Sequence, residues 1–246
     1  MTNAPLRIAL QKSGRLSEQS HELLRECGIK YHVGKRTLIA KSTTFPLEIL
    51  LLRDDDIPQY VEDGTAHLGI LGENVVVEKV RQIEMVKRLG FAKCRLSIAI
   101  PKNEVYLDVS YFEGKTIATS YRPILERFLE GKVKEVTIKD IGGSVEIAPN
   151  IGLADGIFDI VSTGGTLRSN GLKEVEKVMG SEAVIIANKH LNEAQQELVD
   201  ELLFRIDTVF NGRKKIYVML NAQETTKEKI IDLLPGVTAP TIMPLN

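Results

Sequence analysis

A short glycine-rich stretch behind an apolar run carries the residues best suited to binding a phosphate. Residues 159–172 read Asp-Ile-Val-Ser-Thr-Gly-Gly-Thr-Leu-Arg-Ser-Asn-Gly-Leu, and the apolar run that ends at Val161 predicts a buried strand. Glycines after a strand let backbone N–H groups converge on an anion, while hydroxyl side chains add donors. We therefore expect a phosphate at Ser162, Thr163, Gly164, Gly165 and Thr166. The alternative is a plain turn in which Thr166 caps the next helix.

Two carboxylates and an aromatic ring accompany this loop in the sequence. Asp159 lies in the predicted strand, where it can orient ribose hydroxyls or a metal-bound water beside the phosphate. Glu146 follows two glycines at a predicted helix start and is either a functional carboxylate or an ordinary first-turn acid. Tyr121 follows another predicted strand, and its ring either stacks on a base or covers the cleft.

A second candidate anion site follows the first predicted strand. The run Gln11-Lys12-Ser13-Gly14-Arg15 places two cations ahead of a helix whose first N–H groups lack partners. A solvated basic turn is the alternative. Arg53 ends another strand, where it can hold a phosphate while Asp54 fixes its orientation. Glu73 follows a third strand and either touches a ligand or caps the next helix.

Strand-like and helix-like runs that alternate along the chain must position these residues, and their rhythm predicts an α/β fold. The polar segment 111–114 predicts a crossover between two lobes. A gapless resemblance between residues 64–72 and 156–164 indicates lobes of similar build, whose strand ends would line one cleft. We place the first lobe at 1–98 and 188–213 and the second at 99–187.

The C-terminal stretch predicts too little structure for a domain of its own. A helix is expected over 193–210, a linker over 212–215, a strand over 216–220 and a helix over 227–234. One strand and one helix cannot bury a core. We therefore expect residues 214–246 to be the beginning of an incomplete third domain, in a truncated or naturally short chain.

Composition excludes several classes of function. In 246 residues, 32 Lys and Arg balance 33 Asp and Glu, so no net field favours nucleic acid or an anionic membrane. No apolar run reaches membrane-spanning length, and the N-terminus has no export signal. We therefore expect a cytoplasmic protein with reduced cysteines. The 4 histidines show no metal-ligand spacing, and no covalent-hydrolase motif occurs.

Seven blocks in order resemble the ATP phosphoribosyltransferase family nearly end to end: residues 11–16, 53–58, 68–74, 94–97, 118–121, 143–149 and 159–172. The resemblance implies two lobes of the periplasmic-binding-protein-like (type II) fold with mixed sheets, and an incomplete ferredoxin-like C-terminal segment. It also implies a glycosyltransferase (pentosyltransferase) that moves the 5-phosphoribosyl group of phosphoribosyl pyrophosphate to N1 of ATP and releases pyrophosphate. That reaction begins histidine biosynthesis.

The same resemblance implies roles for the candidate residues. Residues 162–166 would hold the 5-phosphate, with Asp159 and Glu146 on the ribose and pyrophosphate side. The residues expected near ATP are Gln11, Lys12, Arg15, Arg53, Asp54, Glu73 and Tyr121. Those expected to be catalytic are Lys12, Arg15 and Asp159. The implied cofactor is Mg²⁺, bound mainly through pyrophosphate rather than directly by the protein.

The resemblance also bears on partners and shows two departures. It implies a homo-oligomer, a dimer or, in the complete long form, a hexamer, and feedback inhibition by histidine only where the regulatory domain is complete. His67 stands where the family more often has Asp, and Gly165 where it more often has Ala. A non-catalytic solute-binding protein and a catalytically idle subunit are the rival interpretations.

Overall fold

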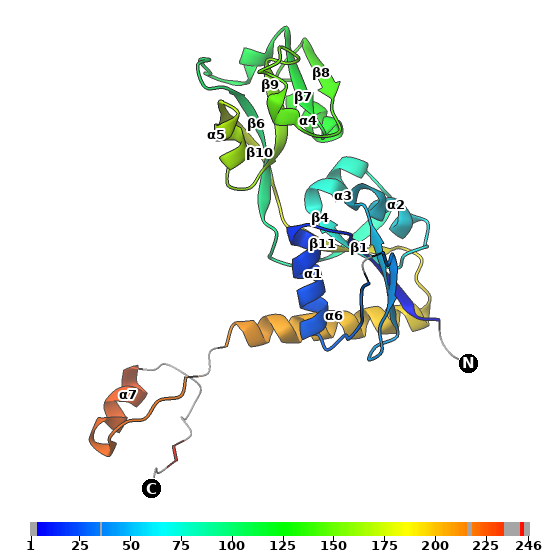
Figure 1. Cartoon of the computed structure of the whole chain (residues 1–246), viewed down its shortest axis with the longest axis vertical. Coiled ribbons are helices and arrows are strands. Elements are labelled where there is room, and N and C mark those ends of the chain that lie inside the picture. The colour runs from blue at the N-terminus through cyan, green and yellow to red at the C-terminus, as the bar shows by residue number, and fades with distance from the viewer. Residues whose placement is uncertain (1–3, 35, 216–217, 234–241, 244–246) are drawn as a thin grey trace. The chain divides into compact units, whose positions relative to one another are not determined.

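The first lobe is built on a mixed sheet of six strands in the order β2-β3-β1-β4-β11-β5. Figure 1 labels β1, β4 and β11 of this sheet. The computed structural model describes residues 4–34, 36–215, 218–233 and 242–243. The strands are β1 (Leu6–Gln11), β2 (Ile39–Lys41), β3 (Leu47–Leu52), β4 (Leu68–Gly72), β5 (Ile83–Arg88) and β11 (Ala183–Asn188). Strand β1 runs parallel to β3 and β4, whereas β11 runs antiparallel to β4 and β5. The carboxyl ends of β1, β3 and β4 therefore meet at one edge.

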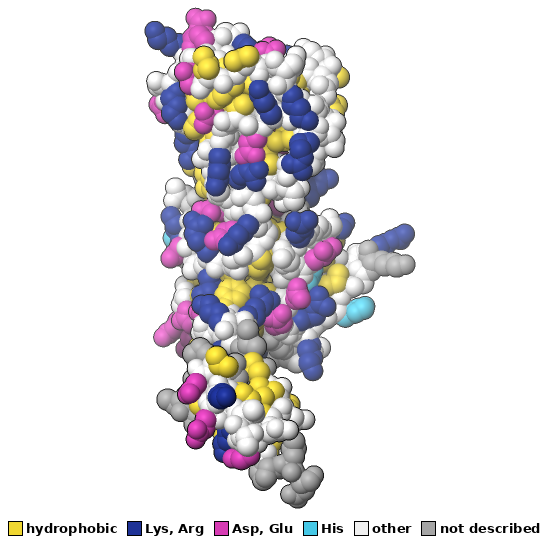
Figure 2. Space-filling view, turned by 90° about the vertical axis from the view of Figure 1, so that its left-hand side faces the viewer, with side chains coloured by type: hydrophobic (Ala, Val, Ile, Leu, Met, Phe, Trp, Pro, Cys, Tyr) yellow, Lys and Arg dark blue, Asp and Glu magenta, His cyan; other side chains and the backbone are white. Residues whose placement is uncertain are grey.

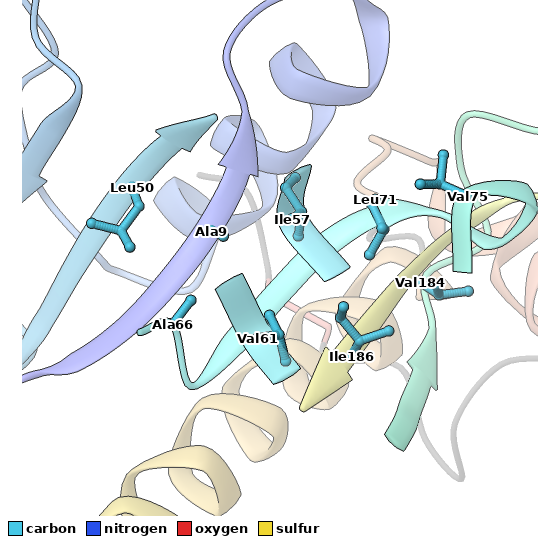
Figure 3. Packing of buried hydrophobic residues seen from close by; sticks show 9 residues of the cluster. All are labelled: Ala9, Leu50, Ile57, Val61, Ala66, Leu71, Val75, Val184 and Ile186. Carbon is cyan, nitrogen blue, oxygen red and sulfur yellow. The ribbon is translucent and has the colours of Figure 1, made fainter. Parts of the chain in front are cut away.

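Helices cover both faces of this sheet. They are α1 (Arg15–Glu26), the 3₁₀ turn η1 (Asp54–Asp56), α2 (Ile57–Glu62), α3 (Glu73–Lys79) and α6 (Glu193–Arg213). Figure 3 shows the core on one face, where Ile57 and Val61 of α2 pack on Ala9 and Ile186. The neighbours of Ala9 in β1 are fully buried on the opposite face, against which α1 packs, since side chains alternate along a strand.

The second lobe has a five-stranded sheet in the order β10-β6-β9-β7-β8. Its strands are β6 (Cys94–Pro101), β7 (Lys115–Thr119), β8 (Val136–Asp140), β9 (Gly156–Val161) and β10 (Leu172–Ser181). Its helical segments are η2 (Val109–Phe112), α4 (Arg122–Leu129), η3 (Val145–Ile147) and α5 (Gly165–Ser169). One core lies under α4 and another under η3 and α5. The predicted α/β fold with two mixed sheets is confirmed.

The two lobes share one strand arrangement. In each, a central strand lies parallel to two neighbours, β1 to β3 and β4, and β7 to β8 and β9. In each, an antiparallel strand follows, β11 beside β4 and β6 beside β9. The gapless alignment of 64–72 with 156–164 is out of structural register, because β4 begins at Leu68 and β9 at Gly156. The shared build thus lies in strand order.

Strand pairing divides the lobes at different residues from those expected. Strand β6 belongs to the second sheet and β11 to the first, so the chain crosses between sheets within 89–93 and again at Glu182. The expected boundaries, 98/99 and 187/188, fall within β6 and β11. The expected crossover at 111–114 is wrong, because Phe112 is fully buried in the second-lobe core. One inward aromatic ring fixes that polar segment to the lobe.

The chain forms two compact units, Met1–Val209 and Phe210–Asn246. The second unit contains η4 (Glu224–Thr226) and α7 (Lys227–Leu233), close to the helix expected at 227–234. Helix α6 extends to Arg213, into the expected linker. Of the strand expected at 216–220, residues 216–217 lie outside the described residues, and 218–220 have no regular structure. Among the described residues, no helix has the length and apolarity to cross a membrane.

Candidate functional site

Three cations gather at the carboxyl edge of the first sheet. Gln11 pairs in register with Leu52, and the Lys12 N–H donates to the Leu52 carbonyl at 2.8 Å, so β1 and β3 end together. Lys12 and Arg53 follow these ends, and Arg15 opens α1. All three are exposed, and none forms an ion pair within the described part of the chain. They are therefore free to bind an anion.

The loop between β9 and α5 presents unused backbone donors. Gly164 is the N-cap of α5 with φ 73°, in the left-handed region. In the described structure the N–H groups of residues 163–166 donate to no acceptor. The alternative in which Thr166 caps the helix is wrong, because Gly164 is the cap and no side chain bonds there. Four free amides at one turn suit a phosphate.

Asp159 and Glu146 lie close enough to influence each other. Burial, together with a smaller contribution from the Glu146 charge, raises the pKa of Asp159 from its ordinary 3.8 to about 6, while the Ile160 N–H partly opposes the shift. That N–H donates to Asp159 Oδ1 at 2.7 Å. Glu146 lies half-buried on η3. The structure thus brings both predicted carboxylates together beside the glycine-rich loop 162–166.

This shift predicts a stability cost at neutral pH. The folded protein retains the Asp159 proton between pH 3.8 and about 6 while the unfolded chain releases it, so stability falls as pH rises through that window. Asp159→Asn should therefore raise the unfolding free energy of the ligand-free protein at pH 7 by about 1 to 2 kcal/mol, after discounting for partial exposure. Urea unfolding at pH 4 and pH 7 measures this. An equal effect at both pH values would contradict it.

Tyr121 connects the site to the first lobe. It is the N-cap of α4, and its hydroxyl has a raised pKa, mainly through burial and then through the charges of Asp159, Asp54 and Asp55. Asp159 belongs to its own lobe, whereas Asp54 and Asp55 lie on η1 of the first. The phenol therefore stays protonated and near acidic groups from both sheets.

Glu73, expected near the nucleotide, is instead paired with Arg88. Its carboxylate forms a two-pronged ion pair with Arg88 of β5, and its N–H donates to the Glu182 carbonyl at 2.9 Å. Arg88 also lies 3.7 Å from the Glu182 carboxylate. Glu73 thus fastens the point where the chain recrosses between sheets, and the structure does not place it open to a nucleotide as expected.

His67 also forms hydrogen bonds within the fold rather than facing the candidate site. Its Nδ1 accepts from the Arg7 N–H at 2.8 Å, and its Nε2 lies 2.9 Å from the Gln195 amide nitrogen. Burial and the Arg7 charge lower its pKa. It precedes β4, at the edge of the sheet opposite Lys12, so it lies outside the candidate site.

Sequence reasoning missed a polar cluster that contacts the glycine-rich loop 162–166. Arg95 and Ser97 of β6 both bond to Glu174 of β10. Arg95 also donates to the Ser162 carbonyl at 3.0 Å. Arg95 and Ser97 fall within one resembling block, 94–97, but Glu174 lies in none, and only strand pairing shows that it faces them.

The donor set fits a hard cation shared with a substrate. Among the described residues, no three His, Cys, Asp or Glu side chains gather closely enough to hold a metal. Asp159 and Glu146 offer carboxylate oxygens, and Mg²⁺ commonly uses one or two carboxylates together with substrate phosphates. Figure 2 shows basic and acidic side chains mixed on one face of the molecule.

Comparison with known proteins identifies the family. The family model described as ATP phosphoribosyltransferase matches residues 53–208, and that of the HisG C-terminal domain matches 212–246. ATP phosphoribosyltransferase of Parabacteroides distasonis is 55% identical over 98% of this chain and 85% of that protein. The corresponding protein of Cytophaga hutchinsonii is 52% identical over 98% and 84%.

Solved structures of similar proteins identify the fold. The ATP phosphoribosyl transferase (HisG:HisZ) complex from Thermotoga maritima matches with TM-score 0.74 and 26% identity, over 85% of this chain and 100% of that one. The amino-acid-binding protein ArtJ from Geobacillus stearothermophilus matches with TM-score 0.58 and 13% identity, over 85% and 91%. The latter shows the fold alone and confirms the two-lobed periplasmic-binding-protein-like architecture. By sequence and by structure, the chain belongs to the ATP phosphoribosyltransferase family.

Proposed function

We propose that this chain is an ATP phosphoribosyltransferase, a pentosyltransferase that joins N1 of ATP to C1 of the ribose of phosphoribosyl pyrophosphate and so begins histidine biosynthesis. The observation that carries the proposal is the row of free amides at 163–166 beside Asp159. It suits a sugar phosphate whose monoester binds the loop while its ribose reaches the carboxylates.

The reaction requires that the two substrates be aligned and that the charge of the leaving pyrophosphate be neutralised. The lone pair of adenine N1 forms the new bond to C1, and the bond from C1 to the pyrophosphate oxygen breaks, so pyrophosphate leaves with that electron pair. No strong base is required, because N1 already has its lone pair. Lys12, Arg15 and Arg53 would neutralise phosphates at the first-sheet edge.

The remaining polar groups would orient the reactants. Asp159 and Glu146 would orient the ribose hydroxyls, with Gln11, Asp54 and Tyr121 on the nucleotide side. Bound Mg²⁺ supplies further neutralisation of pyrophosphate. Glu73 is left out of this set because Arg88 occupies its carboxylate.

The partners and location inferred from the sequence stay predictions. The homo-oligomer, a dimer with a hexamer as the long-form option, is tested by light scattering on the purified protein. Feedback by histidine is tested by adding it to the assay. A cytoplasmic location is consistent with a demand for ATP, and cell fractionation tests it.

The direct assay mixes purified protein with ATP, phosphoribosyl pyrophosphate and Mg²⁺ and follows the phosphoribosyl-ATP adduct by its absorbance and mass. We expect adduct and pyrophosphate in equal amounts, and we expect EDTA to remove both. A protein that binds both substrates yet forms no adduct would be an idle subunit. One that binds neither would favour the solute-binding alternative.

A further inference from the structure

Three successive carbonyl groups of the phosphate loop accept hydrogen bonds from two arginines. The Ser162 carbonyl accepts from Arg95 Nη1 at 3.0 Å, and the Thr163 carbonyl from Arg168 Nη1 at 3.3 Å. The Gly164 carbonyl accepts from the Arg168 backbone N–H at 3.1 Å. Because a trans peptide points its N–H away from its C=O, fixing these carbonyls turns the following amides the other way. Those amides, at 163–165, are among the free donors.

Arg95 is the more firmly held of the two arginines. Its Nε donates to Glu174 Oε1 at 2.6 Å, and its Nη2 donates to Glu174 Oε2. The Glu174 carboxylate also accepts from the hydroxyl of Ser97, which is buried, at 2.7 Å. Arg168, by contrast, is exposed. A two-pronged Arg–carboxylate pair fixes the plane of the guanidinium as well as its place.

The surroundings keep both charges in place. The hydrogen bond from Arg95, and to a smaller extent the one from Ser97, lowers the pKa of Glu174, so the carboxylate stays ionised near neutral pH. The guanidinium is then oriented with a further N–H directed at the Ser162 carbonyl. Its positive charge also offsets the carbonyl dipole at the start of an anion site.

We propose that Arg95 and Glu174 are positioning residues for the phosphate loop: Glu174 orients Arg95, and Arg95 orients the Ser162 peptide so that the amides of 163–165 face the sugar phosphate. This rests on the proposed function. Neither residue touches the reacting atoms, so their loss weakens binding of the phosphoribosyl donor rather than the chemical step.

The test uses two conservative variants of the full chain. Arg95→Lys keeps the charge and loses the fork, and Glu174→Gln keeps the shape and loses the charge. We expect each to raise the Kd for phosphoribosyl pyrophosphate about tenfold, the loss of one charge-assisted hydrogen bond. The KM for ATP and the kcat at saturating donor should change less than threefold, as expected for lost ground-state binding. The double variant should be no worse than Arg95→Lys.

Arg7→Lys is the matched control, because Arg7 pairs with Glu48 through Nε at 3.2 Å at the far edge of the first sheet. It should leave the donor Kd unchanged. In ¹H–¹⁵N spectra, the Gly164 and Gly165 amides should shift in Arg95→Lys and stay fixed in Arg7→Lys. A merely structural role for Arg95 would lower thermal stability without moving these resonances.

The two proposals fail in different ways. If the unaltered protein binds no phosphoribosyl pyrophosphate, the proposed function is wrong. If it binds the donor and both variants, folded by thermal melting, bind equally well, the positioning role is overturned. Should Arg95→Lys not fold, Glu174→Gln alone decides the matter, since it leaves the side-chain volume unchanged.

Discussion

Gly164→Val is expected to weaken binding of phosphoribosyl pyrophosphate about a hundredfold while leaving a folded protein. Gly164 has φ 73°, a conformation that a β-branched residue avoids. Its new Cβ would also lie 3.4 Å from Arg168 Nη1, the group that holds the Thr163 carbonyl. To relieve the backbone strain the peptide must rotate, and the free amides then point elsewhere. Calorimetric titration with the donor and Mg²⁺ measures the loss.

The neighbouring glycine provides the control. Gly165→Ala adds a methyl group that meets only Thr163 Oγ1, at 3.6 Å, and Gly165 lacks the left-handed φ. Its binding should stay within about twofold of the unaltered protein, since ordinary van der Waals contact needs no movement. Equal affinities in the unaltered, Gly164→Val and Gly165→Ala proteins would mean that the phosphate lies elsewhere.

Lys12→Ala is expected to lower kcat about a hundredfold, the usual effect of deleting one preorganised group that stabilises developing charge. The side chain is exposed and forms no ion pair among the described residues, so little native structure depends on it. The unfolding free energy should change by less than about 0.5 kcal/mol. Steady-state kinetics and urea unfolding on the same preparation separate the two effects.

Lys41→Ala is the comparison for a lysine that has no phosphate to neutralise. Lys41 is 78% exposed at the end of β2 and lies 3.2 Å from Glu48, near the start of β3 and away from the carboxyl ends of β1 and β3. Its loss should leave kcat unchanged. If Lys12→Ala retains normal turnover and normal KM values, the cationic edge of the first sheet has no part in the reaction.

Most strands and helices could be predicted from local sequence, because apolar runs mark the elements, and glycines, prolines and polar residues mark the loops between them. In β9, for example, Ile157, Phe158 and Val161 are buried, and Gly164, three residues after the strand ends, has a positive φ. Strand β10 was missed for the opposite reason. Its residues between Leu172 and Ser181 are mostly half-buried, include several charges and contain two register shifts, so no clean period appears.

The site was predictable where one segment supplies it and unpredictable where distant segments meet. The loop 162–166 is contiguous, so its composition alone indicated an anion. Glu174 and Arg95 are 79 residues apart, and they meet only because β10 pairs with β6. Glu73 looked open for ligand binding because its partner, Arg88, lies on a strand separated from β4 by β11. Strand order, which local sequence does not encode, decides both pairings.

The return of the chain to its first sheet has a consequence for folding during translation. Strand β11 lies between β4 and β5, yet it is translated after the whole of the second lobe. While the nascent chain lengthens, β4 and β5 have a gap between them, whereas residues 94–181 form an uninterrupted stretch that can complete its own sheet. The lobe begun second is therefore the one able to fold first on the ribosome, and the lobe that starts the chain must wait.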